Sequence, residues 1–135
     1  MLKVIIDTNI WISFLIGLSL KRLHYFLYDK QFMILISNEQ INELIDVLSR
    51  SKLQKYFSKE QVTEFLKLIE TKSQIVEYKT IVNICRDPKD NYLLSMAIDS
   101  KADYLITGDA DLLELKKIEG TQIINFNDFQ NRFMR

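Results

Sequence analysis

The run Leu2-Lys3-Val4-Ile5-Ile6-Asp7 sets the architecture of this chain, because it is an apolar segment of strand length that ends on an acid. A second run, Tyr104-Leu105-Ile106-Thr107-Gly108-Asp109, repeats that arrangement near the other end of the chain. Between them, apolar runs alternate with segments of helical periodicity, a pattern typical of a layered α/β domain with a mostly parallel sheet. Ligands of such sheets bind at the carboxyl ends of the strands, so we expect Asp7 and Asp109 to be neighbours.

The apolar runs predict a sheet of about five strands. The predicted strands are residues 2–7, 32–37, 74–77, 104–107 and 122–125. Residues 20–28 and 90–100 have helical periodicity. Ser58-Lys59-Glu60-Gln61 has the spacing of a capping box and predicts a helix after it, and Asn127 with Gln130 predicts the start of a C-terminal helix.

Composition indicates one folded domain over residues 1–135. Hydrophobic residues make up 47% of the chain, with only 3 Gly and 1 Pro, which argues against a disordered or collagen-like chain. A lone cysteine, Cys85, cannot form an intramolecular disulfide, and the N-terminus has no targeting segment, so we expect a cytoplasmic location. The longest apolar stretch, residues 10–18, is far too short for a bilayer span, and no membrane role is expected.

Charge alone does not indicate a nucleic-acid partner. Lys and Arg number 18 against 18 Asp and Glu, so the chain has no global positive field. Basic residues nevertheless crowd one region: Arg50, Lys52, Lys55 and Lys59. Such a run is either a solvated face or a set of RNA phosphate contacts, and the sequence leaves both interpretations open.

Each candidate acid also has a structural explanation. Asp7 and Asp109 stand where a helix N-cap would follow a strand, and Asp90 follows Pro88 at a helix start, where the helix dipole favours a negative charge. Glu43 lies beside the apolar stripe of its predicted helix, and periodicity permits an exposed, solubilising glutamate there. The residues of that stripe are Ile41, Leu44, Ile45 and Leu48.

Taken together, the four acids Asp7, Glu43, Asp90 and Asp109 would suit a hard metal ion. Carboxylate oxygens without Cys or His are ligands that Mg²⁺ and Mn²⁺ prefer. An ion held this way can activate a water and stabilise a leaving oxygen, so phosphodiester hydrolysis is the expected reaction. Without metal the like charges would repel, so at least one acid should keep a proton to unusually high pH.

With these residues laid out, the chain resembles the PIN-domain family, specifically the small bacterial and archaeal branch described as toxin components of toxin-antitoxin pairs. The order and spacing of several stretches carry the resemblance, which runs nearly end to end. Those stretches are residues 4–9, 43–50 and 85–91, Ala97, and residues 102–113.

The resemblance implies a three-layer α/β/α sandwich and a Mg²⁺- or Mn²⁺-dependent endoribonuclease that leaves a 5′-phosphate, with a cognate antitoxin and a homodimer as expected partners. The residues that match the family's four acidic positions are Asp7, Glu43, Asp90 and Asp109. Asn9 and Thr107 match polar residues that orient those acids, and Asp111 matches an acid often found two positions after the last. The resemblance also favours Glu43 over Glu39, a choice that periodicity leaves open.

Other conspicuous residues have structural interpretations. His24 has no His or Cys partner for zinc, and Cys85 is interpreted as a small buried apolar residue. We expect three residues after the first acid to lie in the core: Trp11, Phe14 and Leu15. Three aromatic residues could instead form an apolar surface for a partner, and the sequence leaves this open: Tyr25, Phe26 and Tyr28.

Two hypotheses compete with the ribonuclease. One is a non-catalytic RNA- or partner-binding module that retains the acids for stability or metal. The other is a phosphatase with Asp7 as covalent nucleophile, similar to haloacid-dehalogenase-like enzymes. Those enzymes have a second aspartate two positions after the first, where this chain has Asn9, so the phosphatase hypothesis fits less well.

Overall fold

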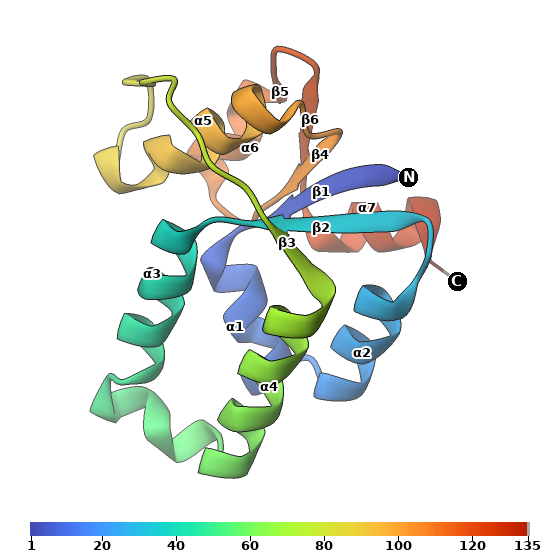
Figure 1. The fold of residues 1–135 in the computed structure, drawn as a ribbon. Coiled ribbons are helices and arrows are strands. Elements are labelled where there is room, and N and C mark those ends of the chain that lie inside the picture. The colour runs from blue at the N-terminus through green and yellow to red at the C-terminus, as the bar shows by residue number, and fades with distance from the viewer. Residues whose placement is uncertain (135) are drawn as a thin grey trace.

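The computed structural model describes residues 1–134, and its strands form one six-stranded sheet in the order β3-β2-β1-β4-β6-β5 (Figure 1). The strands are β1 Leu2–Ile6, β2 Phe32–Ile36, β3 Ser73–Ile75, β4 Tyr104–Ile106, β5 Lys117–Ile118 and β6 Thr121–Ile124. All neighbouring pairs are parallel except β5 with β6. The predicted α/β class with a mostly parallel sheet is confirmed.

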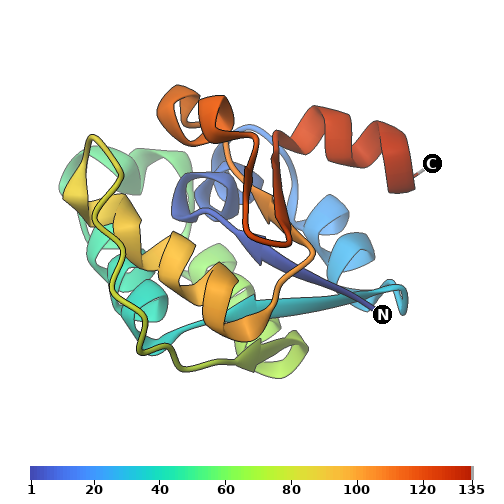
Figure 2. The ribbon, with the colours of Figure 1, turned by 90° about the horizontal axis from the view of Figure 1, so that it is seen from above.

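Helices cover both faces of the sheet and complete a three-layer α/β/α sandwich (Figures 1 and 2). The helices are α1 Thr8–Ile16, α2 Leu20–Tyr28, α3 Asn38–Leu48, α4 Lys59–Lys72, α5 Asn91–Ser100, α6 Ala110–Leu115 and α7 Phe126–Phe133, with 3-10 turns η1 Ser51–Tyr56 and η2 Pro88–Asp90. One core joins the sheet to α1, α2, α3, α4 and α7, and a second joins it to α5 and α6.

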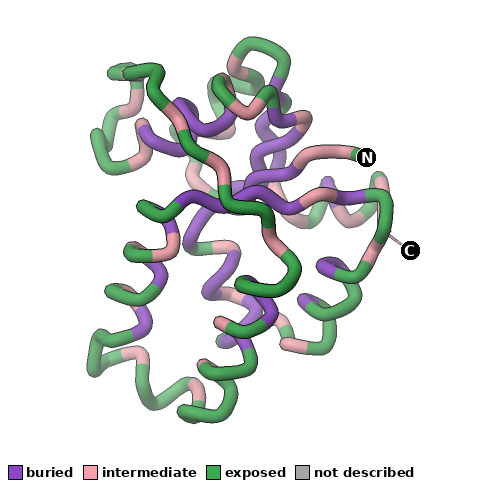
Figure 3. Tube along the Cα trace, in the orientation of Figure 1, coloured by how far each residue is buried: buried purple, intermediate pink, exposed green. Residues whose placement is uncertain are grey.

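The alternation of side chains along β1 explains the two cores. Successive residues of a strand point to opposite faces. Val4 and Ile6 accordingly lie in the larger core and Ile5 in the smaller one, and all three are fully buried. In Figure 3 the central strands are buried, whereas the outer sides of the helices are exposed. Trp11 and Phe14 lie in the larger core, as predicted.

The termini of two helices test the capping predictions. Ser58 and Gln61 form the predicted capping box at the start of α4. The predicted start of the C-terminal helix was two residues too late, because Asn125, not Asn127, is the N-cap. The Asn125 side chain accepts a hydrogen bond of 2.7 Å from the backbone N–H of Asp128. Both asparagines have the right spacing, but starting at Phe126 lets Phe129 pack in the core.

The sixth strand was missed in the sequence. β5 pairs two residues, Lys117 and Ile118, with β6 through a tight return in which Glu119 has a φ of 49°. A pairing this short has no readable periodicity, because alternation is recognised only over four or more residues. The strand lies at the edge of the sheet, so the other five strands still form the mostly parallel sheet that was predicted.

Two predictions about side-chain burial were wrong. Ile45 was placed in the apolar stripe of α3, yet it is 50% exposed. The buried face of α3 is made instead by Gln40, Leu44 and Leu48, which repeat every four residues. Phe26 was a candidate for a partner-facing surface, but it is fully buried in the core.

The segment between β3 and η2, residues 76–87, crosses the outside of α5 without forming a helix or strand (Figure 2). It is tied down by Asp99, whose carboxylate accepts a 2.9 Å hydrogen bond from the backbone N–H of Thr80. This segment brings the chain to Asp90 at the start of α5. Within residues 1–134, no helix combines the length and the apolarity that crossing a bilayer requires.

Candidate active site

The carboxyl ends of β1 and β4 meet at the centre of the sheet. The two strands are paired in register, with Ile6 opposite Ile106, although a hundred residues separate them. The backbone N–H of Asp7 continues the ladder by donating a 2.8 Å hydrogen bond to the carbonyl of Ile106. The order of strands reverses at this pair, and that is where open α/β sheets bind ligands. The predicted adjacency of these strand ends is confirmed.

Asp7 is a nearly buried acid, with 7% of its surface exposed. It is the N-cap of α1, and its Oδ2 accepts a 2.6 Å hydrogen bond from Thr107 Oγ1. Burial raises the pKa of the Asp7 carboxyl above its usual value; hydrogen bonds from Thr107 and from the backbone of Asn9 lower it, and the charges of Glu43 and Asp109 raise it. Asp7 thus sits in an environment that disfavours its own charge.

Asp109 is the N-cap of α6, as Asp7 is the N-cap of α1. Its Oδ1 accepts hydrogen bonds of 2.8 Å and 3.0 Å from the backbone N–H groups of Asp111 and Leu112 at the start of α6. The hydroxyl of Thr107 accepts a 3.0 Å hydrogen bond from the backbone N–H of Asp109 while it donates to Asp7. One threonine therefore sets the spacing of the two loops that carry these acids.

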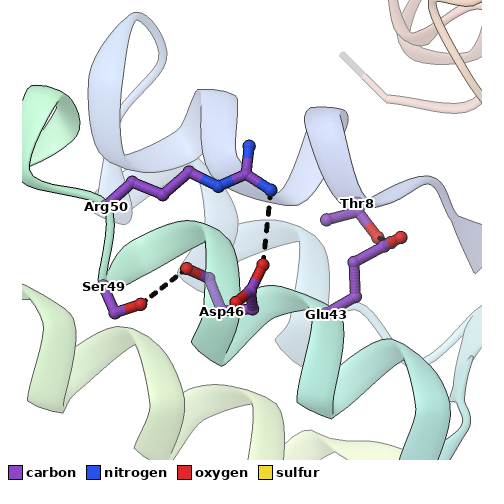
Figure 4. Close-up of polar contacts among 5 residues, drawn as sticks. All are labelled: Thr8, Glu43, Asp46, Ser49 and Arg50. Carbon is purple, nitrogen blue, oxygen red and sulfur yellow. Dashed lines mark hydrogen bonds and ion pairs between the residues drawn. The ribbon is translucent and has the colours of Figure 1, made fainter.

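Glu43 reaches the same region from α3. One helical turn earlier, the fully buried Gln40 donates from Nε2 to the carbonyl of Ile6 at 2.5 Å, which ties α3 to the end of β1. Residues three apart share a helix face, so this tie also turns Glu43 towards the start of α1. There its Oε1 accepts a hydrogen bond from Thr8 Oγ1 (Figure 4) and another, of 2.7 Å, from Tyr92 OH. Glu43 is half-buried, and the exposed, solubilising glutamate that periodicity permitted is wrong.

Tyr92, on α5, is 8% exposed and keeps its proton. Burial raises the pKa of the phenol, the hydrogen bond with Thr8 lowers it, and Glu43 raises it again through its hydrogen bond and its charge. Tyr92 OH also lies 3.3 Å from Thr8 Oγ1. Because the phenol stays protonated, Tyr92 OH can donate a hydrogen bond to the Glu43 carboxylate.

Asp90 is the last residue of η2 and occupies the N-cap position of α5, where its side chain makes no capping hydrogen bond. Asp87 caps the start of η2 by accepting a 3.1 Å hydrogen bond from the backbone N–H of Lys89. Burial, followed by the charges of Asp7 and Asp109, raises the pKa of Asp90 to about 6. This value agrees with the expectation that one acid of the group keeps its proton to unusually high pH.

Cys85 differs from its prediction as a buried apolar residue, since it is half-buried. It lines a small hollow together with Asp90 and Asp109. Burial raises the pKa of its thiol, and the charges of Asp90 and Asp109 raise it further. The thiol is therefore a neutral group that lies beside Asp90 and Asp109.

The acids do not converge on a preformed metal cage. Within residues 1–134, no three Asp, Glu, His or Cys side chains are close enough together to hold an ion as they stand. Burial raises the pKa of Asp7 and of Asp90, and the charges of neighbouring candidate acids raise both further. Like charges repel when no cation lies between them, so the acids lie near one another without closing around an ion. Their donor atoms are all oxygen, which fits Mg²⁺ or Mn²⁺.

Basic side chains follow the helix that carries Glu43. Arg50 follows α3, is exposed, and lies with its Nη2 3.3 Å from Asp46 Oδ2. Figure 4 shows that Glu43, Asp46 and Arg50 project from the same side of this region. Lys52 and Lys55 follow on η1 and are exposed as well.

Three polar residues of this region were missed in the sequence: Thr8, Gln40 and Tyr92. Gln40 precedes Glu43 by three residues, so the sequence could have predicted that both polar side chains lie on one face of the helix. Tyr92 gave none, because it is embedded in the apolar periodicity of α5. Conversely, Asn9 contacts Asp7 only through its backbone N–H, at 3.4 Å.

Known proteins share both the sequence pattern and the fold. The sequence profile of the PIN domain matches residues 3–111. An uncharacterized protein of Methanocaldococcus jannaschii is 34% identical over 119 residues, which cover 85% of this chain and 76% of that protein.

Two solved structures resemble the whole fold. A chain of VapBC2 from Rickettsia felis, solved bound to a DNA fragment from its promoter, has a TM-score of 0.61 at 20% identity, covering 92% of this chain and 98% of its own. A protein of Pyrobaculum aerophilum has a TM-score of 0.64 at 18% identity, covering 97% of this chain and 88% of its own. At these identities the likeness shows the fold.

Proposed function

Because this chain belongs to the PIN-domain family, we propose that it is a metal-dependent endoribonuclease that hydrolyses RNA phosphodiester bonds. The observation that carries the proposal is the meeting of acids beside the carboxyl ends of β1 and β4: Thr107 hydrogen-bonds both Asp7 and Asp109, and Glu43 accepts a hydrogen bond from Thr8, next to Asp7. Burial raises the pKa of Asp90 most, and the charges of Asp7, Asp109, Asp87 and Glu43 raise it further, as expected of acids that lie near one another.

The metal would be Mg²⁺ or Mn²⁺, as one or two ions, held by the four acids. When bound, it supplies an activated water and neutralises charge on the phosphoryl oxygens. Thr107 orients Asp7, and Asp109 is oriented by the amides at the start of α6. The protein thus hydrogen-bonds both oxygens of Asp7 and one oxygen of Asp109. Asn9 and Asp111 would support the loops on which these acids lie.

The basic residues that follow α3 would bind the phosphates of the substrate. We assign this role to Arg50, Lys52 and Lys55, because they are exposed and lie next to the helix that carries Glu43. The exposed pair of Arg50 with Asp46 contributes little to folding, so Arg50 is free to exchange Asp46 for a phosphate.

We further propose that the protein acts in the cytoplasm as the toxin of a toxin-antitoxin pair, with a cognate antitoxin protein as partner, and that it forms a homodimer. The similarity to a VapBC2 chain from Rickettsia felis supports an antitoxin partner. The lone Cys85 is compatible with a reducing compartment.

The deciding experiment compares wild type with Asp109→Asn in Mn²⁺ binding and RNA cleavage. Asn caps a helix as well as Asp does, so this variant removes the charge and leaves the start of α6 intact. At about 100 times the dissociation constant, bound metal adds about 2.7 kcal/mol of stability, which raises the melting temperature by about 5–15 °C.

We expect the wild type to show this metal-dependent rise and to release RNA fragments with 5′-phosphates, and the variant to show neither. A rise of equal size in both proteins would remove Asp109 from the metal site. Unimpaired host growth on overexpression of soluble, active protein would overturn the toxin role.

One observation favours a second candidate, a non-catalytic RNA- or partner-binding module. Within the described residues 1–134, no three potential ligands are preassembled for an ion. Metal binding without cleavage of any RNA in a varied set would support this module over the nuclease.

A further inference from the structure

Glu43 is held differently from the other acids. Asp7 and Asp109 follow strands directly and are oriented by the loops in which they lie, whereas Glu43 projects from α3 on a long side chain. A glutamate side chain has three rotatable bonds, so its carboxylate adopts one position only when neighbours hold it. The neighbours that hold it here are two hydroxyl groups, from Thr8 on α1 and Tyr92 on α5.

These hydroxyls come from residues next to the other acids. Thr8 directly follows Asp7, and Tyr92 is two residues after Asp90. Through them, the carboxylate of Glu43 is linked to the start of α1 and to the start of α5. The three helices that carry Asp7, Glu43 and Asp90 therefore meet in one hydrogen-bonded group.

Both hydroxyls converge on the same oxygen. Glu43 Oε1 accepts from Thr8 Oγ1 and from Tyr92 OH, whereas Oε2 accepts no hydrogen bond from residues 1–134. Two donors on one oxygen fix the plane of a carboxylate and leave its second oxygen available to an incoming cation or water.

We propose that Tyr92, together with Thr8, is a positioning residue for Glu43, holding Oε1 so that Oε2 is available as a metal ligand. The inference rests on the proposed metal-dependent function and deepens it by naming the residues that prepare the helix-borne ligand. Partners that orient a ligand typically account for a 10–100-fold change in metal affinity.

The chain offers a matched control for this role. Tyr78, in the segment that crosses α5, lies beside Tyr92 with the ring centroids 6.4 Å apart. Its hydroxyl makes no hydrogen bond within residues 1–134, whereas that of Tyr92 bonds Glu43. Tyr92→Phe and Tyr78→Phe thus remove the same atom from one aromatic pair, and only the first removes a contact with an acid.

The test is Mn²⁺ titration of the intact chain by calorimetry, for wild type, Tyr92→Phe, Tyr78→Phe, Glu43→Gln and the double variant Tyr92→Phe/Glu43→Gln. We expect Tyr92→Phe to weaken Mn²⁺ binding about 10-fold or more and Tyr78→Phe to leave it unchanged. In the Glu43→Gln background, Tyr92→Phe should add no further loss, because the carboxylate through which it acts is gone.

A purely structural tyrosine would change the urea midpoint and leave the Mn²⁺ dissociation constant alone, and that result would overturn the proposal. An equal loss on Tyr92→Phe with and without Glu43 would also overturn it, since the effect would not pass through Glu43. If Tyr92→Phe does not fold, Thr8→Val makes the same test on the other hydroxyl. Failure of the wild type to bind Mn²⁺ would instead overturn the metal-dependent function itself.

Discussion

Thr107 Oγ1 donates a 2.6 Å hydrogen bond to Asp7 Oδ2, and this contact joins the ends of two strands that lie a hundred residues apart in the chain. Thr107 is fully buried and Asp7 nearly so. A hydrogen bond to a charged group in such surroundings is worth about 1.5–3 kcal/mol. It also opposes the effect of burial on the pKa of Asp7.

Replacing Thr107 with Val should therefore destabilise the fold by about 1–3 kcal/mol and weaken Mn²⁺ binding, because Asp7 loses the donor that favours its charged form. Urea unfolding and Mn²⁺ titration measure the two effects. Thr121→Val is the matched control: its hydroxyl is buried and donates to the carbonyl of Ala102 at 2.7 Å, away from the acids. We expect Thr121→Val to lose stability and keep its Mn²⁺ affinity. Equal Mn²⁺ affinity in both variants would contradict the role of Thr107.

Asp7→Asn should abolish RNA cleavage and leave the free energy of unfolding within about 1 kcal/mol of wild type. Asn is as good an N-cap as Asp, so α1 keeps its start. The amide also removes a charge that burial disfavours. Cleavage assays and urea unfolding of the same preparation test the prediction, and full activity of the variant would remove Asp7 from the catalytic group.

The contribution of Asp90 to metal-free stability should fall as the pH rises from about 4 to 6. The pKa of Asp90 is raised to about 6 in the folded protein, from 3.8 as the reference value. Between these values the folded state binds the proton and the unfolded state does not, so stability is lost as pH increases. Asp90 is partly exposed, and solvent reduces the full effect to on the order of 1 kcal/mol.

Asp90→Asn should remove that pH dependence without removing a helix cap, because the Asp90 side chain makes no capping bond. In chelator, the variant should be more stable than wild type at pH 7.5 and equally stable near pH 4. Urea unfolding across this range measures the difference. A constant difference between the two proteins at every pH would show that Asp90 does not titrate as described.

Arg50→Ala should weaken RNA binding and reduce the slope of log affinity against log salt by about 0.7, the value for one phosphate contact on a single strand. Stability should change by less than about 1 kcal/mol, since the pair with Asp46 is exposed. Arg132→Ala is the control, because Arg132 lies near Tyr104, at the amino end of β4. An unchanged salt slope in Arg50→Ala would show that Arg50 is a solvent-exposed residue that contacts no phosphate.

The class of the sheet and the helix caps at Asp7, Ser58 and Asp109 were readable in the sequence because they depend on local features. An apolar run followed by Asp7 or Asp109 specifies a strand and the helix start after it, and hydrogen bonds within a few residues satisfy both. The two-residue strand β5 and the choice of Asn125 over Asn127 were not readable. In both cases packing against the sheet selected between local patterns that were equally good.

The amino-acid order alone therefore specified an α/β chain with acids at two strand ends, because strand periodicity and capping act over a few residues. Tertiary packing alone placed Glu43 under the hydroxyls of Thr8 and Tyr92 and raised the pKa of Asp90. Those features depend on burial and on charges brought together from distant segments, and neither quantity exists until the chain has folded.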